Sequence, residues 1–186
     1  MPHPFLEVAG WISSNMNQRV EMIRSMARVA LGFHHFGRTE RGMDLLVDSV
    51  IILDSLQPEE KVAPNTFAFL AGVLYKLKDY QDSDALVDKL SDPLVVELIA
   101  SSSSHRLAIA QMRFLREEFD EGWIMLRSIE FEELGQEEID ECFRNLITYS
   151  NIPETQWEKF ILDSRFENFV LLHFLPILAS YPQHPA

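Results

Sequence analysis

The chain has 186 residues, of which 47% are apolar and 24% are charged, and its formal net charge is −13. This length and composition predict one globular domain over residues 1–186 and exclude a disordered chain, because ample apolar surface is available for burial. The negative charge repels phosphate groups, which argues against nucleic acid and anionic membranes as partners and favours a basic or mixed-charge protein segment.

The ends of the chain and its single cysteine predict a cytoplasmic location. MPHPFLEVAG lacks the basic head and apolar run of a signal peptide. Cys142 has no second cysteine to pair with, which suits a reducing compartment. The most apolar run, FVLLHFLPILA at 169–179, is shorter than the roughly 20 residues that span a bilayer. We therefore expect no membrane insertion.

Helices are predicted along the whole chain, most of them in pairs. A short helix over Phe5–Ser14 comes first, followed by pairs at 22–36 with 43–56, 66–77 with 84–90, and 105–118 with 123–134. Asp92-Pro93 provides an N-cap and a first-turn proline, so VVELIA at 95–100 is also predicted as helix. In 22–36 the apolar spacing predicts one buried face, formed by Met22, Met26, Val29, Ala30, Phe33 and Phe36.

The breaks within the three pairs recur about every 40 residues when they are aligned on Thr39, Tyr80 and Phe119. A small residue precedes each of these positions by nine residues, and another follows by three: Ala30, Ala71 and Ala110, then Gly42, Ser83 and Gly122. Helices cross closely only where side chains are small. The pattern therefore predicts a stack of helical hairpins.

Small residues on both sides of an aromatic-bearing turn resemble the tetratricopeptide repeat. FAFLAGVLYKLKDYQDSDALVDKLSDP, with its Asp79-Tyr80 turn and closing Pro93, matches best. Thr39 stands where an aromatic is usual, the third unit lacks the closing proline, and the repeats exceed the family's roughly 34 residues, which implies insertions near 57–63 and 98–102. The resemblance covers about 22–130 and implies an all-α, right-handed stack of antiparallel helix pairs with N- and C-terminal capping helices.

Helices at about 136–182 are predicted to cap this stack. Glu137 and Glu138 suit the first turn of a helix that runs from 136 to 149, and Thr155-x-x-Glu158 is a capping-box pattern. The run 169–179 is interpreted as a closing helix; left exposed, it would make the protein prone to self-association. Two alternatives stay open for residues 150–186: they close the stack from outside, or they fill its groove.

The sequence lacks the motifs of common catalytic and cofactor sites, so we predict a protein that is not an enzyme and holds no cofactor or metal. Cys142 has no local base and is interpreted as a structural thiol. His34 and His35 point about 100° apart on a helix, which is a poor geometry for sharing a metal ion. Seven carboxylates at 130–141 are interpreted as a solvated acidic face: Glu130, Glu132, Glu133, Glu137, Glu138, Asp140 and Glu141.

The tetratricopeptide resemblance implies a concave groove lined by the first helix of each pair. Carried over unit by unit, the positions that face a partner are Arg24, Ala27, Leu31, His34 and His35, then Asn65, Ala68, Gly72, Tyr75 and Lys76, and finally Ser104, Leu107, Gln111, Phe114 and Leu115. This wall carries no carboxylate, and Tyr75 and Phe114 are its expected anchors. The alternative is that these residues pack against another helix of the same chain.

We therefore predict a non-catalytic adaptor or chaperone that holds an extended or helical segment of another protein. Small size, acidity and repeat number resemble the chaperones of bacterial type III secretion systems. A structural subunit that docks through its apolar C-terminal helix is the first alternative, and a homodimer is left open. A carboxylate-based metal enzyme at 130–141 is the second alternative.

Overall fold

The computed structural model describes residues 16–56 and 64–180, and within these ranges the protein is all helical, with no β-strand. The chain separates into two compact units, unit 1 (Met1–Val95) and unit 2 (Val96–Ala186). The predicted helix over Phe5–Ser14 and the predicted insertion at 57–63 lie outside the described residues. The single domain over 1–186 stays a prediction.

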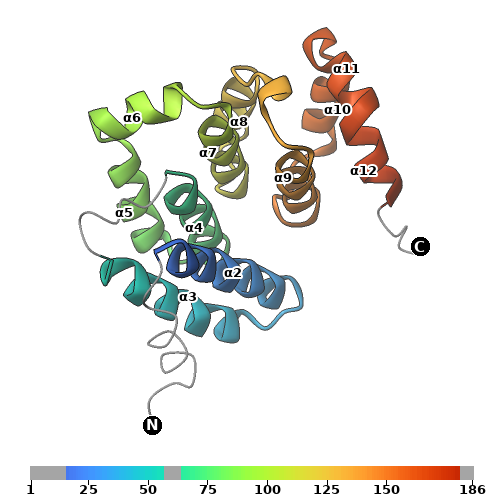
Figure 1. The fold of residues 1–186 in the computed structure, drawn as a ribbon. Coiled ribbons are helices and arrows are strands. Elements are labelled where there is room, and N and C mark those ends of the chain that lie inside the picture. The colour runs from blue at the N-terminus through green and yellow to red at the C-terminus, as the bar shows by residue number, and fades with distance from the viewer. Residues whose placement is uncertain (1–15, 57–63, 181–186) are drawn as a thin grey trace. The chain divides into compact units, whose positions relative to one another are not determined.

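Unit 1 contains two helical hairpins (Figure 1). Helix α2 (Met16–His35) packs along α3 (Thr39–Asp54), and α4 (Pro64–Lys76) packs along α5 (Tyr80–Leu90). The two hairpins contact each other through α2 and α4. Helix α6 (Pro93–Ala100) crosses the boundary between the units and contains no buried residue. Its start confirms the predicted cap, because Asp92 Oδ1 accepts a hydrogen bond from the Leu94 amide at 2.9 Å.

Unit 2 begins with a third hairpin and continues with shorter helices (Figure 1). The hairpin pairs α7 (Ser103–Leu115) with α8 (Phe119–Leu126), and α7 also packs on α9 (Gln136–Tyr149). The remaining elements are η1 (Phe131–Glu133), α10 (Glu154–Leu162), η2 (Ser164–Phe166), α11 (Glu167–Phe169), a π-helical turn η3 (Val170–Phe174) and α12 (Leu175–Ser180).

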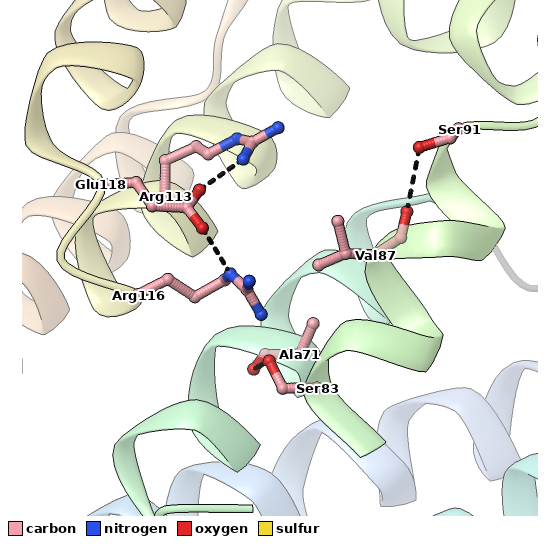
Figure 2. A network of polar contacts seen from close by, with 7 residues as sticks. All are labelled: Ala71, Ser83, Val87, Ser91, Arg113, Arg116 and Glu118. Carbon is pink, nitrogen blue, oxygen red and sulfur yellow. Dashed lines mark hydrogen bonds and ion pairs between the residues drawn. The ribbon is translucent and has the colours of Figure 1, made fainter. Parts of the chain in front are cut away.

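The small residues found in register lie at the close contacts of the hairpins. A Cβ atom on Gly42 would sit 2.8 Å from the carbonyl oxygen of Ala30. In the second hairpin, the Ser83 hydroxyl donates a hydrogen bond of 2.8 Å to the carbonyl of Ala71 (Figure 2). In the third, the space at Gly122 is bounded by the Phe114 ring, 3.0 Å from a Cβ placed there. Each hairpin therefore has one of the small residues at a close contact between its two helices.

The three hairpins also share one turn geometry that is not evident from the sequence. Gly37, Lys78 and Glu117 have left-handed backbones, with φ of 72°, 71° and 64°. In each turn this residue donates its amide to the carbonyl three residues back, and the next residue donates to the carbonyl five residues back. This is the Schellman motif, which satisfies the last carbonyls of a helix. Only the first turn uses glycine for the left-handed position.

Replacing Lys78 by glycine is therefore expected to raise the free energy of unfolding by about 0.5–1 kcal/mol, because glycine adopts a positive φ without the penalty of a Cβ atom. Chemical denaturation of the two proteins measures the difference. Lys78→Ala is the matched control, since it removes the charge and keeps the Cβ atom. A gain of equal size in Lys78→Ala would show that the charge, not the backbone, sets the effect.

The buried face of α2 differs from the predicted one. Ile23, Met26, Ala27, Ala30 and Leu31 are buried, whereas Val29 is 51% exposed and Phe36 is 79% exposed. The prediction of Val29 and Phe36 as core residues was wrong. The buried positions follow a three- and four-residue spacing that starts at Ile23, and the helix ends at His35, so Phe36 is carried into the turn.

The C-terminal run 169–179 divides into two faces. Phe169, Val170, Phe174 and Ile177 are buried in the core of unit 2, and both η3 and α12 pack on α9. Four leucines on the other side are exposed: Leu171, Leu172, Leu175 and Leu178. The segment is thus an integral part of the core of unit 2 and also presents an apolar surface.

Candidate functional site

The predicted groove residues fall into three groups by burial. Leu31, Gly72, Lys76, Gln111 and Phe114 are buried, His34, Asn65 and Tyr75 are partly exposed, and His35 is exposed. The other buried positions of the predicted wall are Ala27, Ala68, Leu107 and Leu115, and Arg24 and Ser104 are partly exposed. Gln111, Phe114 and the other α7 positions belong to unit 2, and the remaining residues belong to unit 1.

Phe114 does not suit the predicted role of a partner anchor. Its side chain is 0% exposed, and its ring lies 4.7 Å from that of Trp123 in an edge-to-face contact. It also covers the backbone of Gly122. A contact with a partner would require removing this ring from the core of unit 2. The sequence pattern alone could not separate the buried and open faces of an apolar helix such as α7.

Four predicted residues of unit 1 come together with further side chains at the turns of its two hairpins. We call this set the turn surface: His34, His35, Phe36, Tyr75, Lys76, Lys78 and Tyr80. The two turns are adjacent, because the Leu77 side chain would meet a Cβ atom on Gly42 at 2.8 Å. The positive charges of Lys76 and Lys78 act on His34, which also places them nearby.

Aromatic rings form the open part of the turn surface. The rings of Tyr75 and Tyr80 meet edge to face at 4.8 Å, and those of His35 and Phe36 do so at 5.4 Å. Phe36 is 79% exposed and Tyr80 50% exposed. Phe36, Lys78 and Tyr80 were missed as site residues. Their position at the recurring turns, which align on Thr39, Tyr80 and Phe119, is the signal by which they could be found.

Two lysines, Lys76 and Lys78, act electrostatically on His34 in the turn surface. Burial, and then the charges of Lys76, Lys78 and His35, lower the pKa of His34 from its ordinary value. Its Nδ1 lies 3.1 Å from Thr39 Oγ1, within hydrogen-bond distance. Lys76 also lies in the last turn of α4, where the helix dipole favours positive charge.

In comparisons with known proteins, no family model, curated protein or solved structure matches the chain. The residues themselves therefore carry the functional argument.

The sites considered for chemistry have ordinary structural explanations. Cys142 is fully buried, and this burial, with Glu141 and Glu138 nearby, raises the pKa of its thiol, which disfavours the reactive thiolate. Ser103 donates a hydrogen bond of 2.6 Å to Glu133, and Ser104 donates one to Glu138. Two carboxylates of the 130–141 cluster thus bind hydroxyl groups in the first turn of α7.

Two further findings, on metal-binding groups and on membrane-spanning helices, apply to the described residues 16–56 and 64–180. Within them, no group of three or more histidine, cysteine, aspartate or glutamate side chains is arranged to hold a metal ion. The same residues include no helix of the length and apolarity that a membrane span requires.

The lowered pKa of His34 predicts a pH dependence of stability. Since the unfolded state takes up its proton at a higher pH than the folded state, protonation favours unfolding. The contribution of His34 is fully present above the unfolded pKa of about 6.5, and is lost as the pH falls from there through the lower pKa of the folded state. His34→Asn should flatten the loss between neutral and mildly acidic pH, measured by urea denaturation. Parallel curves for both proteins would contradict this assignment.

Proposed function

We propose that the chain is a non-catalytic protein-binding module whose helix pairs form a right-handed, tetratricopeptide-like stack. Three observations support the stack: the hairpins repeat a small-residue contact, they share one Schellman turn, and two of them pack through their first helices. Such repeats generate extended binding surfaces from neighbouring hairpins.

The turn surface carries the proposal. Adjacent exposed apolar side chains mark interaction surfaces, and aromatic side chains dominate binding energy at protein interfaces. Here the exposed Phe36 ring contacts His35, the exposed Tyr80 ring contacts Tyr75, and Lys76 and Lys78 lie near His34. The protein as a whole has a net charge of −13. We therefore propose a partner segment that places apolar side chains on the rings and a carboxylate near Lys78.

Affinity capture from the native host followed by mass spectrometry tests this function. Proteins retained by the wild type should be lost from Phe36→Ala and Tyr80→Ala and weakened by Lys78→Ala. Val47→Ala is the control, since Val47 is a similarly exposed apolar residue, 53% exposed, on α3. Retention that is equal in all four variants, or equally lost in Val47→Ala, would argue against the turn surface. A secreted or membrane-active protein among the specific partners would support the narrower chaperone function.

A structural subunit is the second candidate, and the exposed leucines of the C-terminal run favour it. Leu171, Leu172, Leu175 and Leu178 recur at the spacing of one helical face. A subunit docked through this face should lose its assembly when Leu172 and Leu175 are replaced by glutamine. If sedimentation velocity shows a monomer for both the wild type and the variant, the chain does not dock to a second copy of itself through this face.

A further inference from the structure

A pocket of about 320 Å³ opens in unit 2 between α8, α10 and the turn that follows α10. Helix α8 and its C-cap contribute Asp120, Trp123, Ile124 and Arg127. These positions are spaced by three and four residues, so they occupy one face of the helix. A volume of this size lies at the small end of the range for pockets that bind small molecules.

Helix α10 presents a matching face on the other side. Gln156, Lys159, Phe160 and the C-cap residue Asp163 line the pocket with the same three- and four-residue spacing. The pocket is therefore built by two helical faces whose C-terminal ends meet. Arg127 Nε and Asp163 Oδ2 join these ends in an ion pair of 3.2 Å.

Three aromatic residues that line the pocket, Trp123, Phe160 and Phe166, belong to the core of unit 2. The Trp123 and Phe160 rings stack at 5.1 Å, and the Phe160 and Phe166 rings lie 4.8 Å apart. Ile124, which is 66% exposed, adds an aliphatic wall. A ligand that fills this space must therefore offer an apolar group.

The charged side chains at the rim of the pocket form two sets: Arg127 and Asp163 pair with each other, whereas Asp120 and Lys159 are unused. Asp163 is held by Arg127 and also accepts a hydrogen bond of 3.1 Å from the amide of Arg165. Asp120 and Lys159 make no ion pair or hydrogen bond with any residue that the structure describes, and they stand on opposite walls of the pocket. The rim thus offers one carboxylate and one ammonium group to a ligand.

Two buried polar atoms belong to the same lining residues. Trp123 Nε1 is a donor and Gln156 Oε1 is an acceptor, and neither has a hydrogen-bond partner within residues 16–56 and 64–180. An unsatisfied buried donor or acceptor costs about 1–3 kcal/mol. A small side-chain rotation toward the pocket would let a ligand that carries both an acceptor and a donor relieve these costs.

We propose that this pocket binds a free α-amino acid with a large apolar side chain, in its zwitterionic form. The ammonium group meets Asp120 and Gln156, the carboxylate meets Lys159 and the indole N–H of Trp123, and the side chain fills the aromatic space. A simple anion or cation would leave one of the two unused charges without a partner. This site lies in unit 2 and does not depend on the proposed protein-binding function of the turn surface in unit 1.

Titration of the full chain with three related compounds tests the site. Phenylalanine carries both charges, phenylalaninamide carries only the ammonium group, and N-acetylphenylalanine carries only the carboxylate. The indole N–H signal of Trp123, assigned by its loss in Trp123→Phe, reports binding by NMR. Phenylalanine should shift this signal with an affinity about tenfold or more above that of either analogue, the usual effect of losing one charge-assisted contact.

Two variants test which charged side chain of the protein contacts which charged group of the ligand. Lys159→Gln should weaken phenylalanine about tenfold and leave phenylalaninamide unchanged, whereas Asp120→Asn should weaken phenylalanine similarly and leave N-acetylphenylalanine unchanged. Glu121→Gln and Lys89→Gln are the controls, since neither residue lines the pocket. No shift of the Trp123 signal with phenylalanine, or equal affinity for all three compounds, would overturn the proposal. Equal affinity for N-acetylphenylalanine and phenylalanine would also overturn it, and would point to a peptide C-terminus as the ligand.

Discussion

Replacing Phe160 by alanine is expected to lower the free energy of unfolding by about 3–5 kcal/mol, the usual loss for a large aromatic side chain in a packed core. Phe160 is 2% exposed and stands at the centre of the aromatic core of unit 2. Its ring lies 5.1 Å from Trp123, 5.3 Å from Phe174 and 5.8 Å from Phe143. The variant therefore loses contacts with α8, α9 and the C-terminal segment at once.

Urea denaturation followed by tryptophan fluorescence measures this loss, because Trp123 and Trp157 both contact the Phe160 ring. The matched control is Leu162→Ala, two residues along the chain, whose side chain is 82% exposed. It should change the free energy of unfolding by no more than about 0.5 kcal/mol. Equal losses in the two variants would show that unit 2 lacks the packed aromatic core described above.

Replacing Gly42 by alanine is expected to destabilise unit 1 by about 1–3 kcal/mol, the usual cost of overpacking a close contact. The added Cβ atom would lie 2.8 Å from the carbonyl oxygen of Ala30 and 2.8 Å from Leu77 Cδ2. The backbone oxygen cannot move without separating α2 from α3. The steric cost therefore exceeds the roughly 1 kcal/mol that alanine usually gains over glycine inside a helix.

Gly32→Ala gives the opposite sign and serves as the control. Gly32 lies inside α2, and a Cβ atom there meets no atom within 4 Å. This variant should gain about 0.5–1 kcal/mol from helix propensity alone. Thermal or chemical denaturation of both variants measures the difference between them. A gain in both would mean that the small residue at Gly42 is not a close-packing contact.

Predictions that depend on local sequence describe the fold well. The all-helical class follows from three- and four-residue apolar spacing, and the start of α6 follows from Asp92-Pro93. The Ala30–Gly42 and Ala71–Ser83 contacts were visible as small residues in register. Such features can be predicted from the sequence because each depends on a few neighbouring residues, or recurs at the same position in another hairpin.

The left-handed turns were harder to predict from the sequence. Gly37 announces a positive φ, but Lys78 and Glu117 adopt the same geometry without a glycine. In the third turn, Glu118 lies between two guanidinium groups and accepts hydrogen bonds from both Arg113 and Arg116 (Figure 2). In the second, Asp79 accepts the Asp82 amide at 3.3 Å. Helix packing and side-chain caps therefore impose a backbone that the local sequence disfavours.

The candidate sites were predicted only in part, because an apolar helix does not record which of its faces meets another helix. Tyr75 and His34 are partly exposed, whereas Phe114, expected as an anchor for a partner, lies inside the core of unit 2. Phe36 was placed inside and lies in a turn. These errors share one cause, since rotating the assumed buried face by one residue moves each side chain by about 100°.

The sequence by itself determined the helices, the hairpin breaks and the small residues at which the hairpins close, because these depend on spacing along one chain segment. Only the tertiary structure decided which aromatic rings are core and which are open. It also brought α8 and α10 together, so that Asp120 and Lys159 face one pocket from separate helices. No pattern within either helix predicts that meeting, since it depends on the stacking of Trp123 on Phe160, two residues that are distant in the sequence.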